Sequence, residues 1–129
     1  MNKDKAVPTD SELNILNVLW KRGESTVREI HEALTQKTGY TTTLKFIQIM
    51  REKKLVERIS EKRPHTYKAL APQKSTETKL LSSWIGKLTQ GSAASLAMKA
   101  LDMHPVSNTE LTELRDLLDK IEKKNQKDL

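Results

Sequence analysis

Apolar residues recur every three or four positions along much of the chain, which is the spacing of one face of an α-helix. The first such segment has a clear start, because Thr9 is followed three residues later by Glu12, the pattern of a capping box. Gly23 is typical of a helix end. The predicted apolar face comprises Leu13, Leu16 and Trp20, flanked by Ile15, Val18 and Leu19.

The next two segments repeat this pattern. Thr26 and Glu29 predict a second capping box, and Gly39 is the predicted end of that helix. A third helix is expected to begin after Thr41 and to run to about Lys53. The second helix would bury Val27, Ile30 and Leu34, and the third would bury Phe46, Ile47 and Met50, with Leu44 and Ile49 at the edges of that face.

An alternating pattern follows the third helix. "LVERIS" and "HTYKAL" predict two short strands joined by the turn "EKRP", with Tyr67 as the aromatic anchor of the hairpin. Three helices followed by a hairpin is the order of a winged helix-turn-helix. We therefore predict a mainly α fold that opens with this domain.

The polar stretch "APQKST" is a candidate linker, so we expect two domains, residues 1–72 and 73–129. The second is predicted to contain three helices, one over Leu80 to Leu88, one over "GSAASLAMKALDM", and a last one capped by Ser107 and Glu110. Pro105 separates the last two helices.

The apolar stripes of this second domain have little to pack against, because burial is marginal below about 60 residues. A homodimer would supply the missing surface; the alternative is that these helices fold back on the first domain. The residues predicted to lie in the dimer interface are Leu80, Trp84, Leu88, Leu111, Leu114, Leu118 and Ile121.

The third helix carries a polar stripe opposite its apolar face, comprising Thr41, Lys45, Gln48 and Glu52. Thr, Lys and Gln side chains can donate hydrogen bonds to base edges or phosphates. The stripe starts in the N-terminal part of the helix, which is the part that a recognition helix inserts into the major groove. The pattern predicts binding to double-stranded DNA, although a polar outer face is also common on ordinary helices.

The distribution of charge supports the same prediction. Residues 1–72 carry 14 Lys+Arg and 9 Asp+Glu, a net of +5, whereas residues 73–129 carry 9 and 8, a net of +1. Lys62 and Arg63 fall at the predicted hairpin tip, and Arg58 and Lys68 on its strands, where all four could reach DNA phosphates. A solvated basic surface without a partner is the plainer alternative.

The sequence resembles the penicillinase-repressor (BlaI/MecI) family of winged-helix regulators. The resemblance runs from Pro8 to about Ile121. It is carried by "PTDSELNILNVLW", "RGESTVREIHEAL", "GYTTTLKFIQIM", "EKKLVER", "RPHTYKAL", "GSAASLAMKAL" and "SNTELTELRDLLDKI".

The resemblance implies a homodimer that blocks transcription from an inverted-repeat operator. It also implies a membrane sensor metalloprotease as a partner. Once this partner has sensed a signal, the repressor is cleaved in its dimerisation domain. Carried over by position, the recognition helix would present Thr41, Thr42, Lys45 and Gln48, and the wing would present Arg63.

Two single positions and one bond depart from the family pattern. Lys54 stands where a glycine usually ends the third helix, so a lysine must adopt the left-handed conformation or the cap must differ. Ile49 stands where many members have an arginine or another polar residue, which puts one DNA contact in doubt. The bond cleaved in well-known members joins Asn and Phe; the matching residues here are Lys99 and Ala100, so the cut and the inducing signal are in doubt too.

Other chemistry has little support in the sequence. The chain has no cysteine, which excludes disulfides and the cysteine-based copper sensing of some relatives, and His31, His65 and His104 form no ligand-spaced pair. No catalytic motif is present, so we expect neither an enzyme nor a cofactor nor a small-molecule substrate.

No apolar run could span a bilayer and "MNKDKAVPTD" has no secretory h-region, so a cytoplasmic protein is the default expectation. Two alternatives remain: a winged-helix regulator controlled by a small-molecule ligand, and a helical interaction module with an incidental basic face.

Overall fold

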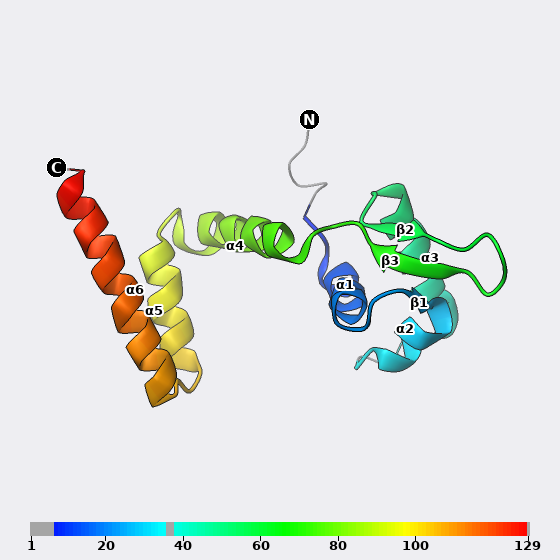
Figure 1. The fold of residues 1–129 in the computed structure, drawn as a ribbon, viewed down its shortest axis with the longest axis horizontal. Coiled ribbons are helices and arrows are strands. Elements are labelled where there is room, and N and C mark those ends of the chain that lie inside the picture. The colour runs from blue at the N-terminus through cyan, green and yellow to red at the C-terminus, as the bar shows by residue number, and fades with distance from the viewer. Residues whose placement is uncertain (1–6, 36–37, 129) are drawn as a thin grey trace. The chain divides into compact units, whose positions relative to one another are not determined.

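The computed structural model describes residues 7–35 and 38–128, and it confirms the predicted class, a winged helix-turn-helix followed by helices (Figure 1). The chain divides into two compact units, the first ending at Ser83 and the second beginning at Trp84. Its elements are α1 (Asp10–Arg22), β1 (Ser25–Thr26), α2 (Val27–Ala33), α3 (Tyr40–Glu52), β2 (Val56–Arg58), β3 (Thr66–Ala69), α4 (Gln73–Thr89), α5 (Ala93–Met103) and α6 (Asn108–Lys127).

The predicted capping boxes are confirmed at α1, α2 and α6. At α2, the Thr26 backbone N–H donates to Glu29 Oε1 at 2.8 Å, and the Glu29 N–H donates to the Thr26 hydroxyl at 3.1 Å. The hydrogen bond from the Thr26 backbone N–H lowers the pKa of Glu29, and the hydrogen bond with the Thr26 hydroxyl and the charge of Arg22 lower it further. Gly23 ends α1 with φ of 84°, a conformation that favours glycine.

The boundary between α2 and α3 differs from the sequence prediction. α2 ends at Ala33, because Leu34 is extended with ψ of 133° and packs against the core instead of continuing the helix. Gly39 does not close α2. It is the N-cap of α3, with an ordinary φ of −68°, and α3 therefore begins at Tyr40, before the predicted start.

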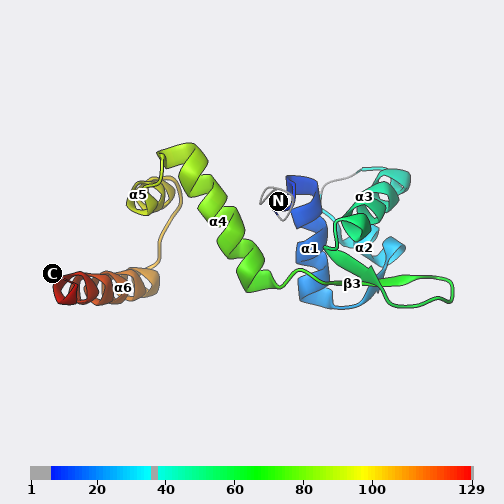
Figure 2. The same ribbon diagram turned by 90° about the horizontal axis from the view of Figure 1, so that it is seen from above.

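The hairpin of β2 and β3 is confirmed, but the sheet has a third strand that the sequence did not reveal. β1 pairs antiparallel with β3 through Ser25 opposite Tyr67 and Thr26 opposite Thr66, so the strand order is β1-β3-β2. A strand of two residues is too short to show alternation. In Figures 1 and 2 the loop of residues 59–65 projects beyond the helices; we call this loop with β2 and β3 the wing.

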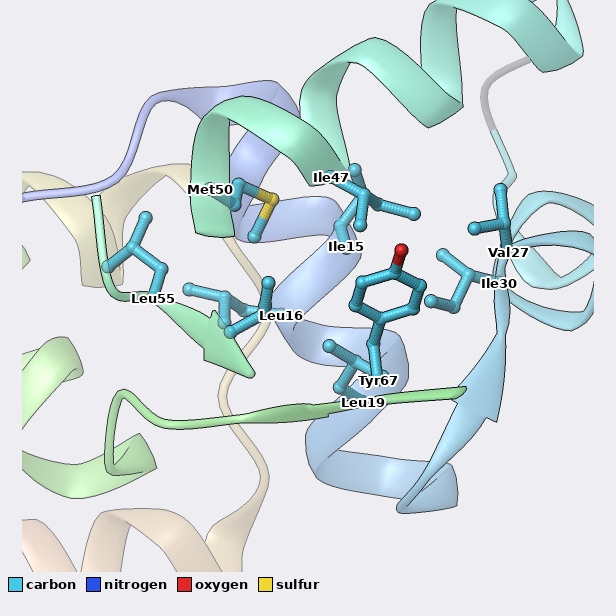
Figure 3. Close-up of a cluster of buried hydrophobic side chains, with 10 residues drawn as sticks. Ile15, Leu16, Leu19, Val27, Ile30, Ile47, Met50, Leu55 and Tyr67 are labelled. Carbon is cyan, nitrogen blue, oxygen red and sulfur yellow. The ribbon is translucent and has the colours of Figure 1, made fainter. Parts of the chain in front are cut away.

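One hydrophobic core joins the three helices to the sheet (Figure 3). On α1 the buried face is turned from the predicted one, because Leu13 and Trp20 are only half-buried. Trp20 lies at the margin, where its indole N–H donates to the Ala71 carbonyl at 2.9 Å. The buried apolar residues of this core are Ile15, Leu16, Leu19, Val27, Ile30, Ile47, Met50, Leu55, Val56 and Tyr67.

An ion pair between buried Glu12 and partly exposed Lys53 fixes the C-terminal end of α3 to the start of α1. The Glu12 side chain is nearly inaccessible, and Lys53 Nζ lies 2.8 Å from Glu12 Oε2 and 3.1 Å from Oε1. The same carboxylate accepts the Thr9 backbone N–H at 2.9 Å. Buried carboxylates are tolerated when they are paired and hydrogen-bonded in this way. The contact therefore helps to set where α3 lies on the domain.

Lys54 has the left-handed conformation that the departure from the family pattern led us to consider, with φ of 64°. It closes α3 in a Schellman motif, in which the Leu55 N–H donates to the Met50 carbonyl at 2.9 Å and the Lys54 N–H to the Arg51 carbonyl at 3.1 Å. A lysine in this conformation is strained, whereas glycine is not.

We therefore expect Lys54→Gly to raise the free energy of unfolding by roughly 1 kcal/mol. Chemical denaturation of the two proteins at equal concentration measures the difference. Lys62→Gly, in the exposed wing loop, controls for the loss of a surface lysine and should not stabilise. A less stable Lys54→Gly protein would contradict the strain argument.

The expected linker "APQKST" is largely helical, which corrects that prediction. Pro72 precedes the first turn of α4, and its carbonyl accepts the Thr76 N–H at 3.0 Å and the Thr76 hydroxyl at 2.6 Å. Proline suits a helix start because the backbone N–H that it lacks would have no partner within the first turn of the helix. Leu80, farther along α4, is 7% exposed in the single chain, so little of it is left for a partner.

The second unit has a different character from the first. None of its described residues, 84–128, is buried. α5 and α6 are not packed closely along their lengths, as Figure 2 shows. Thr89 orders the turn between α4 and α5 by donating to the Ile85 and Ser92 carbonyls. Separately, none of the described helices combines the length and the apolar character that crossing a membrane requires.

Candidate nucleic-acid interface

The polar stripe of α3 faces solvent, as the sequence predicted. Thr41, Thr42, Lys45 and Gln48 are all exposed, whereas Thr43, Ile47 and Met50 on the opposite side are buried. This opposition arises because α3 packs against both α1 and α2, so one full side of the helix is enclosed. The exposed stripe is therefore held on a rigid element.

The first turn of α3 is suited to a negatively charged partner. It contains no acidic residue, and its N-cap, Gly39, offers no side chain to cap the turn. A helix N-terminus carries a partial positive charge, and its uncapped backbone N–H groups can donate to an anion. Thr41 and Thr42 belong to this turn, so their hydroxyl groups lie beside these N–H groups.

The tip of the wing is ordered by Ser60. Its hydroxyl donates to the Lys62 carbonyl at 3.0 Å and accepts the Lys62 N–H at 3.2 Å, while the Ser60 carbonyl lies 2.9 Å from His65 Nδ1. Because a carbonyl only accepts, His65 must carry a proton on Nδ1. Lys62 and Arg63 are both exposed on this ordered loop.

The cations on the wing strands are placed differently from those at its tip. Arg58 lies 3.6 Å from Glu61, and Lys68 lies 3.8 Å from Glu57. Within the described part of the chain, Lys62 and Arg63 form no such pair. The tip is therefore the more strongly cationic part of the wing.

Two residues that the sequence analysis missed lie on the same side of the domain. The Arg28 guanidinium stacks over the Tyr40 ring, 4.9 Å from its centroid. The Tyr40 ring meets His31 edge-on at 5.7 Å, and His31 Nδ1 is 2.9 Å from the hydroxyl of buried Thr43. No sequence signal marks Arg28, since a lone arginine on the outer face of a helix is commonplace and only the packing of α2 on α3 brings it to Tyr40.

The family model described as "Penicillinase repressor" matches residues 8–120. The chain belongs to the penicillinase repressor family. The protein is therefore a DNA-binding transcriptional repressor, of a class whose members are generally not enzymes.

The other comparisons add little. No curated protein matches the sequence. A solved structure on the regulation of DNA binding of Bordetella bronchiseptica BpsR by 6-hydroxynicotinic acid aligns with a TM-score of 0.48 at 15% identity, covering 92% of this chain and 82% of that one.

The residues predicted to form the dimer interface are at least partly exposed, apart from Leu80. Trp84, Leu88, Leu118 and Ile121 are exposed by 42%, 70%, 61% and 46%, and Leu111 and Leu114 are half-buried. The matched cleavage positions, Lys99 and Ala100, lie exposed within α5.

Proposed function

We propose that the protein represses transcription as a homodimer bound to an inverted-repeat operator, with one α3 helix in each half-site. The observation that carries this proposal is the exposed α3 stripe of Thr41, Thr42, Lys45 and Gln48 on a firmly packed helix in a domain that carries the excess positive charge. Membership of a repressor family supplies the class of partner.

In the proposed complex, α3 enters the major groove. Lys45 and Gln48 are the residues best suited to bases, because lysine donates to guanine and glutamine forms a bidentate pair with adenine. Thr41 and Thr42, with the N-terminal N–H groups of α3, contact the phosphate at the groove edge. Lys62 and Arg63 reach a neighbouring phosphate from the wing and set the register without reading sequence.

The homodimer rests on the second unit. A chain whose last helices bury none of their described residues leaves apolar side chains in water, and large exposed apolar patches mark interaction sites. A two-fold interface would bury the same stripe on both copies. The proposed interface comprises Trp84, Leu88, Leu111, Leu114, Leu118 and Ile121; Leu80 is left out because the single chain already covers it.

We propose further that proteolysis in the second unit relieves repression, with the partner being a membrane sensor metalloprotease. A cut between Lys99 and Ala100 would leave α6, with four of the six proposed interface residues, on a separate fragment. α5 would have to unwind to be cut, and it is suited to do so because none of its residues is buried. The DNA-binding core lies wholly within residues before the cut.

Fluorescence anisotropy with the full chain tests DNA binding. A palindromic duplex selected from random DNA should bind more tightly than a scrambled duplex, and both affinities should fall steeply with added salt, because cationic side chains release counterions. Binding that is insensitive to salt would contradict the proposal and favour an interaction module that recognises proteins through apolar stripes.

A second arm compares residues 1–99 with the full chain on the same palindrome. We expect a folded fragment that binds far more weakly. It has lost α6, and with it four of the six residues of the proposed interface that holds two domains on one operator. A fragment that binds as tightly as the full chain would show that cleavage cannot relieve repression, and control by a small-molecule ligand would become the better hypothesis.

A further inference from the structure

A hollow on the surface of the first unit lies between α2, the N-terminal half of α3 and the wing. Its volume is 720 Å³. It places Arg28 and Tyr40 in one lining with Arg63 of the wing tip, although Arg63 is distant from both in sequence. The described residues of the lining are Thr26, Val27, Arg28, Tyr40, Leu44, Arg63, Pro64, His65 and Tyr67.

The charge of the hollow selects its ligand. Among its described residues, the lining includes two guanidinium groups, Arg28 and Arg63, and no carboxylate. Among the described residues, neither arginine is paired with an acidic side chain. Two cations without counter-charges repel each other, so the hollow is most stable when it holds an anion. Arginine is also the side chain whose planar donors best match a phosphate.

Arg28 is held in place before any ligand arrives. Its guanidinium lies over the Tyr40 ring, and a cation over an aromatic face is attracted by the ring. The Tyr40 ring is itself held in place, because His31 makes an edge-on contact with it and is hydrogen-bonded to buried Thr43. A side chain already ordered loses less entropy on binding than a free one.

We infer that this hollow is a phosphate-binding site for the DNA backbone, in which Arg28, held by Tyr40, and Arg63 contact the same stretch of one strand beside α3. This inference rests on the proposed operator binding and deepens it by assigning α2 a direct contact. Arg28 contributes affinity without sequence preference, as backbone contacts do. Tyr40 is a positioning residue that acts through Arg28.

The test uses the full chain, with affinity measured over a range of salt concentrations on the palindromic and scrambled duplexes. Arg28→Ala should weaken binding roughly tenfold on both, since a charge-assisted contact is lost, and should lower the salt slope by about one. Arg28→Lys should keep the slope while recovering only part of the affinity, because lysine keeps the charge but not the planar fork.

Lys21→Ala is the matched control. It removes one exposed cation from α1, where Lys21 lines a separate depression with Asn17 and Leu34, and it should leave the salt slope unchanged. An Arg28→Ala protein with the affinity and slope of the parent would overturn the inference while leaving operator binding intact. A parent that binds neither duplex in a salt-dependent way would instead refute the proposed function itself.

A double-mutant cycle tests the role of Tyr40. Tyr40→Leu should weaken DNA binding in the parent and have little further effect in the Arg28→Ala protein, because it acts through the arginine. An equal effect in both backgrounds would show that Tyr40 does not position Arg28. Thermal unfolding of each variant separates these effects from a loss of stability, which would not change the salt slope.

Discussion

Leu118→Asp should convert the proposed dimer into a monomer and weaken binding to a palindromic operator by about 100-fold or more. The affinity falls because two linked DNA-binding domains engage an operator at high effective concentration, an advantage of roughly 100- to 10,000-fold that separate domains lack. Leu118 is exposed by 61% in the single chain, so an aspartate there does not disturb the packing of the chain itself. In the dimer it would place a charge in an apolar seam.

Sedimentation velocity and anisotropy measure the two effects. Thr112→Asp is the control, since Thr112 is an exposed residue on the polar side of α6 and the substitution adds the same charge. It should leave both the dimer and the affinity unchanged. A parent protein that sediments as a monomer at micromolar concentration would contradict the architecture proposed here.

The second large effect concerns discrimination between sequences. Lys45→Ala or Gln48→Ala should reduce the preference for operator over scrambled duplex by roughly 1 to 3 kcal/mol, the range for a bidentate contact to a base. Both side chains are exposed, so the loss reflects DNA contacts and not the stability of α3. Competition binding with the two duplexes gives the preference directly.

Arg63→Ala provides the contrast. A phosphate contact carries no sequence information, so this change should weaken both duplexes alike and lower the salt slope by about one. If Lys45→Ala and Gln48→Ala also weakened both duplexes equally, α3 would be a positioning helix and the bases would be read elsewhere.

Several features of both units could be predicted because their signals are local. A capping box needs residues only three positions apart, and the boxes at Thr9, Thr26 and Ser107 are all formed. The polar stripe of α3 was predictable for the same reason, since helical periodicity alone decides which residues share a face. The left-handed Lys54 is one of the two outcomes considered for a lysine at a position where the family usually has glycine.

The tertiary structure decided what depends on residues distant in sequence. Ser25 and Thr26 form a strand only because β3, some forty residues later, offers them backbone partners, and Glu12 becomes buried only because Lys53 reaches it from the end of α3. The hollow that joins Arg28 to Arg63 exists only once α2, α3 and the wing are packed. The sequence by itself determined the helices, the three capping boxes and the face that α3 presents, because those depend on local geometry. It did not determine where α2 ends and α3 begins. Packing decided which charges are paired and which are left for a partner, because ion pairs form between residues that only the folded chain brings together.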